Sequence, residues 1–366
     1  MKLLKYFIYS NWHLFVILGL DFLTSLNLTN YTNNLSVDET KLLVNFGNLS
    51  GNFIFLLAPL GNVSLKLAKQ KSSIRYLLIF NIIMVFISSL ICKLIINYKA
   101  DELLESDLNN IYLIFYNLFV SSMLSISNYY LIGTNNINIL LKYNIFNMLF
   151  NHVIIRYVIQ NYSLFNKIIF VNMGDFLSIF YILYNLDKPT NIKELDYYEN
   201  YQLMIKNSIS ILSLNINNSI TTNMNKYEVK KYQSLSSNFY SYTLLYNPIS
   251  LAIKKNEFPK KFMTKLCIFY YLAIMVCFNA SFYYNNINLS LSNVYLALYY
   301  IVLLLESASA LNDNVKLGIL VNGLVILGKI IYRMFIKIDT MYDYYYFINT
   351  FFIVRILLKL YANKKN

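Results

Sequence analysis

Long apolar stretches without any charged residue dominate the pattern of this chain. Such stretches cover residues 42–65, 77–92, 108–141 and 266–305. A helix rises about 1.5 Å per residue, so roughly 20 apolar residues cross the hydrocarbon core of a bilayer, and water-soluble proteins rarely repeat such runs. The pattern therefore predicts an integral membrane protein that crosses the bilayer several times.

The apolar segments predict an all-α fold, a polytopic transmembrane helix bundle of about 7–10 spans. The expected spans are 6–26, 50–68, 76–97, 110–132, 143–160, 166–186, 266–284, 291–311, 315–337 and 344–362. The first of them resembles a signal peptide, because Lys2 and Lys5 precede it. No small-residue cleavage site follows Leu20, so we expect a retained span or half-span.

Residues 187–265 differ from the rest of the chain. They hold three of the four prolines (Pro189, Pro248 and Pro259) together with many charges and repeated Asn and Ser. This composition is typical of loops and short helices outside the membrane. We therefore predict N-terminal transmembrane helices over 1–186, an extramembrane insert over 187–265 and C-terminal transmembrane helices over 266–366. No internal repeat is visible, which disfavours an inverted-repeat transporter.

The composition supports the membrane class and narrows the partners. The chain is 57% hydrophobic and carries a formal net charge of +13. Its basic residues mostly flank apolar runs, as Lys66 and Lys69 do, which is typical of membrane boundaries; a nucleic-acid partner is therefore not expected. Asn, Ile, Lys, Tyr and Phe, which A/T-rich codons encode, are over-used, and this favours an organellar or otherwise A/T-biased gene.

Small and metal-binding residues are scarce. Nine glycines in 366 residues make GxxxG-type contacts an improbable organiser of the bundle, so we expect bulky aromatic packing instead. His13 and His152 are the two histidines, whereas membrane haem and copper centres need paired imidazoles. The three cysteines lie in apolar runs without a CxxC pair. No catalytic residue, metal ligand or bound cofactor is expected in this chain.

Two carboxylates near the end of the longest apolar run are the sequence's main candidates for intramembrane charge. Glu306 ends that run and Asp313 follows seven residues later, so both lie on one face if the helix continues between them. Ionisable groups at membrane depth tend to face a bundle interior. The alternative is that Glu306 closes one span and Asp313 lies in the turn or caps the helix beginning near Val315.

Several short stretches occur in the same order as the motifs of a known family. They are Ser-Asn-Trp-His-Leu-Phe at 10–15, Phe-Leu-Thr-Ser at 22–25, Ile-Arg-Tyr at 74–76, Leu-Ser-Ile-Ser at 124–127, the Glu306/Asp313 pair followed by Val315, and Tyr-Phe-Ile-Asn at 346–349. Together they resemble cytochrome c oxidase subunit III. The chain departs from that family at Val85, where the family carries a carboxylate, and it lacks the family's later histidines.

The resemblance implies a subunit of the respiratory chain in the mitochondrial inner membrane. It would belong to an oxidoreductase complex but would have no catalytic residues of its own. Its partner would be cytochrome c oxidase subunit I, with haem a and copper held by partner subunits and structural phospholipids bound by the helices. Trp12, Arg75, Tyr76, Glu306 and Asp313 would be structural or lipid-contact positions.

Two further functions fit the same composition. One is an antiporter-like, proton-translocating subunit of respiratory complex I, which needs titratable groups at mid-membrane depth. Lys93, Lys142 and Lys329 lie near predicted span ends instead, which disfavours it. The other is a lineage-specific scaffold subunit of a respiratory or ATP-synthase complex, which needs no motif.

Overall fold

The computed structural model describes residues 2–98 except 58 and 71, residues 110–186 except 155–156 and 158–161, scattered positions between 202 and 276, and residues 315–365. All the regular elements in these ranges are helices. The chain divides into two compact units, one formed by residues 30–222 and the other by residues 1–29 with 223–366. The three-part division predicted from composition concerns the membrane boundary, and it stays a prediction.

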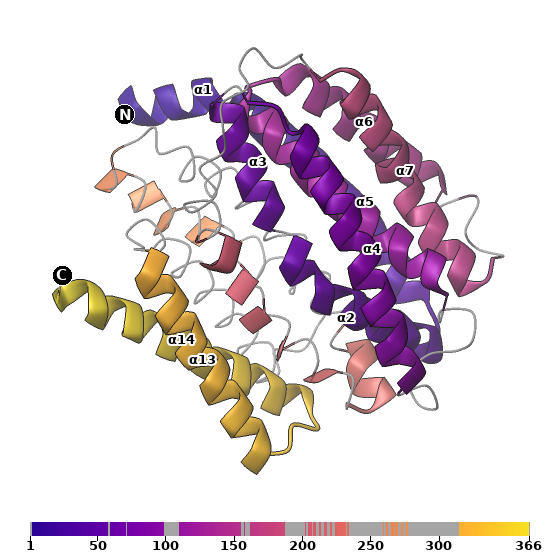
Figure 1. Cartoon of the computed structure of the whole chain (residues 1–366), viewed down its shortest axis with the longest axis vertical. Coiled ribbons are helices and arrows are strands. Elements are labelled where there is room, and N and C mark those ends of the chain that lie inside the picture. The colour runs from indigo at the N-terminus through magenta and orange to yellow at the C-terminus, as the bar shows by residue number, and fades with distance from the viewer. Residues whose placement is uncertain are drawn as a thin grey trace. The chain divides into compact units, whose positions relative to one another are not determined.

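The unit formed by residues 30–222 is built around one central helix, α5 (Ile111–Gly133). Its other helices are α2 (Val37–Leu57), α3 (Pro59–Lys69), α4 (Arg75–Tyr98), α6 (Ile137–Val153) and α7 (Leu164–Tyr184). All five pack on α5, and α6 also lies alongside α7 (Figure 1). Val85, Leu118 and Ile168 belong to the apolar core that α2, α4, α5 and α7 share. The position at which the resemblance would place a carboxylate, Val85, is thus fully buried among apolar side chains.

In the other unit, α13 (Val315–Phe335) and α14 (Met341–Lys365) form a helical hairpin (Figure 1). Aromatic rings hold the hairpin together: the Tyr332 ring lies 5.1 Å from that of Phe347 and 5.9 Å from that of Phe351. The Glu228 carboxylate accepts a hydrogen bond from the Met341 backbone N–H at 3.2 Å. The long helix α1 (Lys2–Asn34) contains the boundary between the units at residues 29 and 30.

Four described helices are long and apolar enough to cross a membrane. These segments are Arg75–Ile95, Ile111–Gly133, Leu164–Tyr184 and Lys316–Phe335. Along α4, large apolar side chains such as Phe80, Ile83 and Phe86 are exposed, at 43%, 51% and 55% of their surface. An apolar face of this length is stable only against lipid or another apolar partner. The chain is a multi-pass membrane protein with an all-α fold, as predicted.

The predicted span over 50–68 covers parts of two helices, and Pro59 begins the second of them. α2 ends at Leu57 and α3 begins at Pro59. Proline disfavours helical backbone at the residue before it and lacks the N–H that a continuing helix would use, whereas it suits the first position of a new helix. The uncharged run 42–65 therefore forms parts of two helices.

Single glycines lie at several close crossings between the described helices. A Cβ atom at Gly61 of α3 would lie 2.6 Å from the Ser125 hydroxyl of α5, and one at Gly133 would lie 2.5 Å from the Ala68 Cβ. A Cβ at Gly328 of α13 would lie 2.9 Å from the Phe351 ring of α14. Each of these crossings uses a single glycine and not a GxxxG pair.

Candidate functional site

The candidate site is a carboxylate in the middle of a membrane-spanning helix. α7 has 21 residues, and Asp175 is the twelfth of them. The residue before it, Gly174, lets α6 approach closely, since a Cβ at this position would lie 2.9 Å from the Phe150 ring. Ionisable side chains at membrane depth are costly, so they are retained mainly where they bind, couple or conduct.

Two side chains of α6 hold the Asp175 carboxylate. The Asn147 amide Nδ2 and the Tyr143 hydroxyl both donate hydrogen bonds to Asp175 Oδ1, the latter at 3.3 Å. Asn151 donates to the Asn147 side-chain oxygen at 2.9 Å and so orients the amide that faces the carboxylate. The three α6 residues are buried and recur every four positions, which places them on one helix face. We call Tyr143, Asn147, Asn151 and Asp175 the α6–α7 cluster.

Aromatic rings adjoin the α6–α7 cluster. The Phe176 ring, next to Asp175 in the chain, lies 5.5 Å from the Tyr116 ring and 5.0 Å from the Phe180 ring. The Tyr116 hydroxyl donates to the Ile169 carbonyl at 3.2 Å, and Ile169 lies six residues before Asp175. A carboxylate beside aromatic faces offers both halves of a site for an organic cation.

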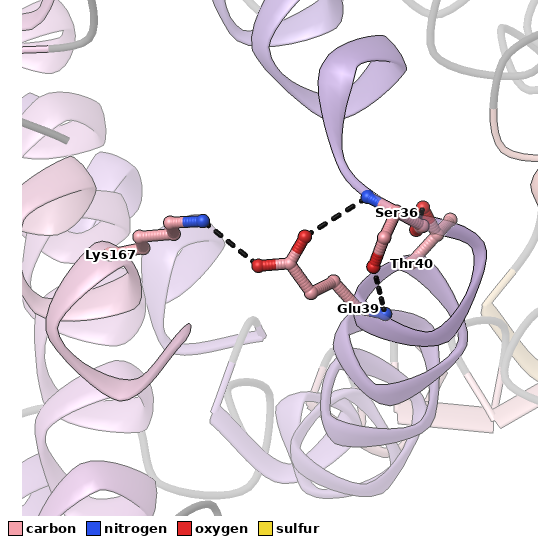
Figure 2. Close-up of polar contacts among 4 residues, drawn as sticks. All are labelled: Ser36, Glu39, Thr40 and Lys167. Carbon is pink, nitrogen blue, oxygen red and sulfur yellow. Dashed lines mark hydrogen bonds and ion pairs between the residues drawn. The ribbon is translucent and has the colours of Figure 1, made fainter. Parts of the chain in front are cut away.

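A second charged contact holds the N-terminal end of α7. The Lys167 ammonium lies 2.9 Å from Glu39 Oε1 of α2 (Figure 2). The other Glu39 oxygen accepts from the Ser36 backbone N–H at 3.0 Å, while the Ser36 hydroxyl accepts from the Glu39 backbone N–H at 3.1 Å. This reciprocal pair is a capping box, so Glu39, in the first turn of α2, both helps to cap α2 and joins it to α7.

The environment of Glu39 favours its ionised form. Burial alone would raise its pKa, but hydrogen bonds from Lys167 and Ser36 and the charge of Lys167 outweigh that effect and lower the pKa below its ordinary value of 4.5. A lowered folded-state pKa stabilises the folded protein at pH values above the unfolded-state pKa. That contribution is lost as the pH falls through the folded-state pKa.

Replacing Glu39 by Gln is expected to remove an acid-sensitive part of the stability. The purified wild type should lose about 1 kcal/mol between about pH 5 and pH 3, because the ion pair is then discharged, whereas Glu39→Gln should already lack that contribution at pH 7. Thermal unfolding measured from pH 3 to pH 8 checks this.

The chain supplies a matched control for the ion pair. Lys337 and Asp339 lie 3.0 Å apart, but their side chains are 86% and 52% exposed. Solvent screens such a pair, so Asp339→Asn should leave the unfolding temperature nearly unchanged. Equal losses from Glu39→Gln and Asp339→Asn would contradict a special role for the Glu39–Lys167 contact.

Of the five residues predicted as structural or lipid contacts, the structure describes three, and these lie on α1 and α4 and not on α6 or α7. Trp12 is 54% exposed on α1, and Arg75 and Tyr76 are exposed in the first turn of α4. The Arg75 backbone N–H donates to the Ser73 hydroxyl at 3.2 Å, which helps to start α4. Glu306 and Asp313 lie outside the described residues. Their proposed structural roles stay predictions.

Asp175 was missed in the sequence although a signal for it was present. Between Lys167 and Asp187 it is the sole charged residue, and it lies eight residues from Lys167. A lone acid at the centre of an apolar run is the pattern that marks intramembrane function. The position of Lys329 was also predicted differently. It was expected near a span end, whereas its side chain is buried within α13.

Comparison with known proteins finds the fold in one group of solved structures. No family model matches the chain, and no curated protein matches its sequence. An inward-facing multidrug resistance MATE family transporter of the MOP superfamily is similar with a TM-score of 0.63 and 11% identity, over 94% of both chains. MATE in complex with MaL6 gives 0.64 and 10% over 96% of this chain and 95% of that one, and an outward-facing MATE transporter gives 0.55 and 12% over 96% and 94%. At these identities the likeness establishes the fold.

These structures overturn the resemblance to cytochrome c oxidase subunit III. The whole-chain fold is that of MATE transporters, so the assignment to the respiratory chain and the partnership with cytochrome c oxidase subunit I are wrong. The complex I and scaffold alternatives are not supported either. Short motifs misled because apolar, A/T-biased segments match one another by composition. The Leu-Ser-Ile-Ser stretch at 124–127, for example, forms the face of α5 on which α3 packs: the Ser64 hydroxyl donates to the Ile126 carbonyl at 2.8 Å.

Proposed function

We propose that this chain is a membrane transporter for small organic solutes, with Asp175 as the titratable group of its translocation site. The observation that supports this most directly is a carboxylate at the centre of α7 within a fold shared with transporters. The absence of a visible sequence repeat, which had disfavoured a transporter, does not weigh against it, since helices can share an arrangement without sharing sequence.

Asp175 has the features that coupling to a proton gradient needs. A coupling group must gain and lose a proton while it remains inside the bundle, so it needs hydrogen-bond donors for its charged form. Asn147 and Tyr143 supply these donors, and both are neutral. Among the described residues, no lysine or arginine side chain forms an ion pair with Asp175, in contrast to the Glu39–Lys167 contact. A carboxylate held by neutral donors can be protonated without breaking an ion pair.

The same surroundings favour a solute that carries a positive charge and an apolar body. Asp175 supplies the negative charge, and Phe150, Phe176 and Tyr116 supply aromatic surface on α6, α7 and α5. An organic cation gains from both, because aromatic faces attract cations and bury apolar groups. Proton and cationic solute would then compete for one carboxylate, which is a simple way to couple their movements.

Transport by the purified protein in lipid vesicles tests the proposal. With the lumen made more acidic than the medium, or the reverse, a fluorescent organic cation should cross the membrane faster than through empty vesicles. The flux should saturate with solute concentration. Flux equal to that of empty vesicles under both gradients, with several cationic and neutral solutes, would overturn the proposal.

The membrane in which the chain works is a separate part of the proposal. The mitochondrial inner membrane is now supported by the A/T-biased composition alone, because the respiratory resemblance is wrong. Fractionation of cells that express a tagged full-length chain would test it. Binding of structural phospholipids also stays a prediction, whereas the expectation of haem a and copper in neighbouring subunits has lost its basis.

A further inference from the structure

A second buried polar surface lies between α2 and residues 213–221, outside the α6–α7 cluster. On α2, Lys41, Asn45 and Asn48 follow one another at spacings of four and three residues, so they share one helix face. Across from them, Ser213, Asn217 and Thr221 recur every four residues and are 0%, 2% and 1% exposed. We call these six residues the α2 seam.

Two hydrogen bonds show that the two faces meet. The Asn48 amide Nδ2 donates to the Thr221 hydroxyl oxygen at 2.8 Å. The Lys41 ammonium donates to the Thr221 carbonyl at 3.1 Å. Thr221 thus lies between two α2 residues that are seven positions apart, which places it over the middle of this polar face. Both partners belong to the unit formed by residues 30–222.

Asn217 is the residue of the α2 seam whose buried side chain suggests a ligand. It lies four residues before Thr221 in the chain and is almost fully buried. Within the described part of the chain, neither its side-chain nitrogen nor its side-chain oxygen has a hydrogen-bond partner. Buried amides are nearly always satisfied by protein, water or ligand, since an unmet polar group is costly. The Asn217 amide therefore lacks the hydrogen-bond partner that a buried amide usually has.

Among the described residues of the α2 seam, Lys41 is the one that carries a charge. Lys41 is half-buried, and burial lowers its pKa, which reflects the cost of its charge in this position. The nearest acid along the buried part of α2, Glu39, is two residues away and therefore about 200° around the helix; its carboxylate is held by Lys167 and Ser36 (Figure 2). Asp38 is exposed at the helix end. The other seam residues supply amides and hydroxyls, which can donate to an anion.

We propose that the α2 seam binds one small anion, of the chloride or simple carboxylate class, between Lys41 and Asn217. The Lys41 ammonium supplies the charge and the Asn217 amide N–H supplies a donor from the opposite face. An anion in this position ties residues 213–221 to α2, so its binding stabilises the unit. This site is separate from Asp175 and does not rest on the transport function.

Thermal unfolding of the full-length chain in detergent tests the anion site. At constant ionic strength, replacing methanesulfonate by chloride, bromide or formate should raise the unfolding temperature in a saturable way, by about 2–4 °C. A response to halides identifies a halide site, and a response to formate alone identifies a carboxylate site; both support the proposal. Identical unfolding temperatures in all four salts would overturn it.

Variants separate an anion site from an ordinary buried asparagine. Asn217→Leu and Lys41→Met should each abolish the anion-dependent shift, whereas Lys142→Met, at an exposed lysine of α6 in the same unit, should keep it. If Asn217 merely lacks a partner, Asn217→Leu should instead raise the unfolding temperature equally in every salt, which contradicts the proposal. Should the variants fail to fold, equilibrium dialysis of the wild type with radioactive chloride and formate decides, and no saturable binding of either overturns it.

Discussion

Replacing Asp175 by Asn is expected to abolish gradient-driven transport while leaving the fold intact. Asn has nearly the shape of Asp, and its side-chain oxygen can still accept from Asn147 and Tyr143, which hold the native carboxylate. It cannot bind and release a proton, so the coupled step is lost. We expect the flux of the cationic solute to fall by about 100-fold or more, the scale at which positioned acid–base groups contribute.

Vesicle flux with an imposed proton gradient measures this effect, with Asp339→Asn as the control. Asp339 is half exposed and pairs with Lys337 at the surface, so its replacement should keep the wild-type flux. Solute exchange without a gradient adds a second reading. If Asp175→Asn still exchanges solute, the carboxylate couples without being needed for binding; if exchange is also lost, it binds the solute as well. Wild-type flux in Asp175→Asn under a gradient would exclude Asp175 as the coupling group.

Replacing Gly133 by Ala is expected to be the most destabilising small change in the unit formed by residues 30–222. The new Cβ would lie 2.5 Å from the Ala68 Cβ and 3.0 Å from the Leu65 carbonyl oxygen. Neither of these atoms can turn aside, because one is a rigid methyl group and the other is backbone. The crossing of α3 and α5 must therefore widen, and overpacking of this kind costs about 1–3 kcal/mol.

Two further variants make the Gly133 result specific. The same change at Gly323, in α13, meets no heavy atom within 4 Å, so it should be neutral or stabilise by up to about 1 kcal/mol through helix propensity. Ala68→Gly combined with Gly133→Ala should recover most of the loss, since it returns the space to the crossing. Thermal unfolding of the four proteins in detergent measures these differences, and equal stability of Gly133→Ala and the wild type would show that α3 can move away freely.

The hydrophobic pattern was sufficient to predict where three of the described helices lie in the sequence. The spans predicted at 76–97, 110–132 and 166–186 agree closely with α4, α5 and α7. Their lengths follow from the thickness of hydrocarbon, a constraint that acts on each helix separately. The segment predicted at 50–68 covers parts of α2 and α3, and α3 begins at Pro59, a residue that was visible in the sequence.

Pairing of distant residues could not be derived from the pattern. Asp175 meets Tyr143 and Asn147, Glu39 meets Lys167 across 128 residues, and Lys41 meets Thr221 across 180. Hydropathy says that a helix is buried in lipid or protein but not which neighbour it faces. The motif comparison failed for a related reason. Short motifs such as Ile-Arg-Tyr recur wherever a basic residue begins an apolar helix.

The amino-acid sequence by itself determined that this is a membrane protein made of helices, because apolar length and boundary charge act locally along the chain. The tertiary structure alone decided where its chemistry lies. A lone aspartate becomes a candidate coupling group only when α6 places neutral donors around it. A scarce glycine becomes essential only when another helix crosses there, and Lys41 becomes a candidate anion ligand only with an amide from a distant segment. Each of these properties depends on a second element, and therefore on packing.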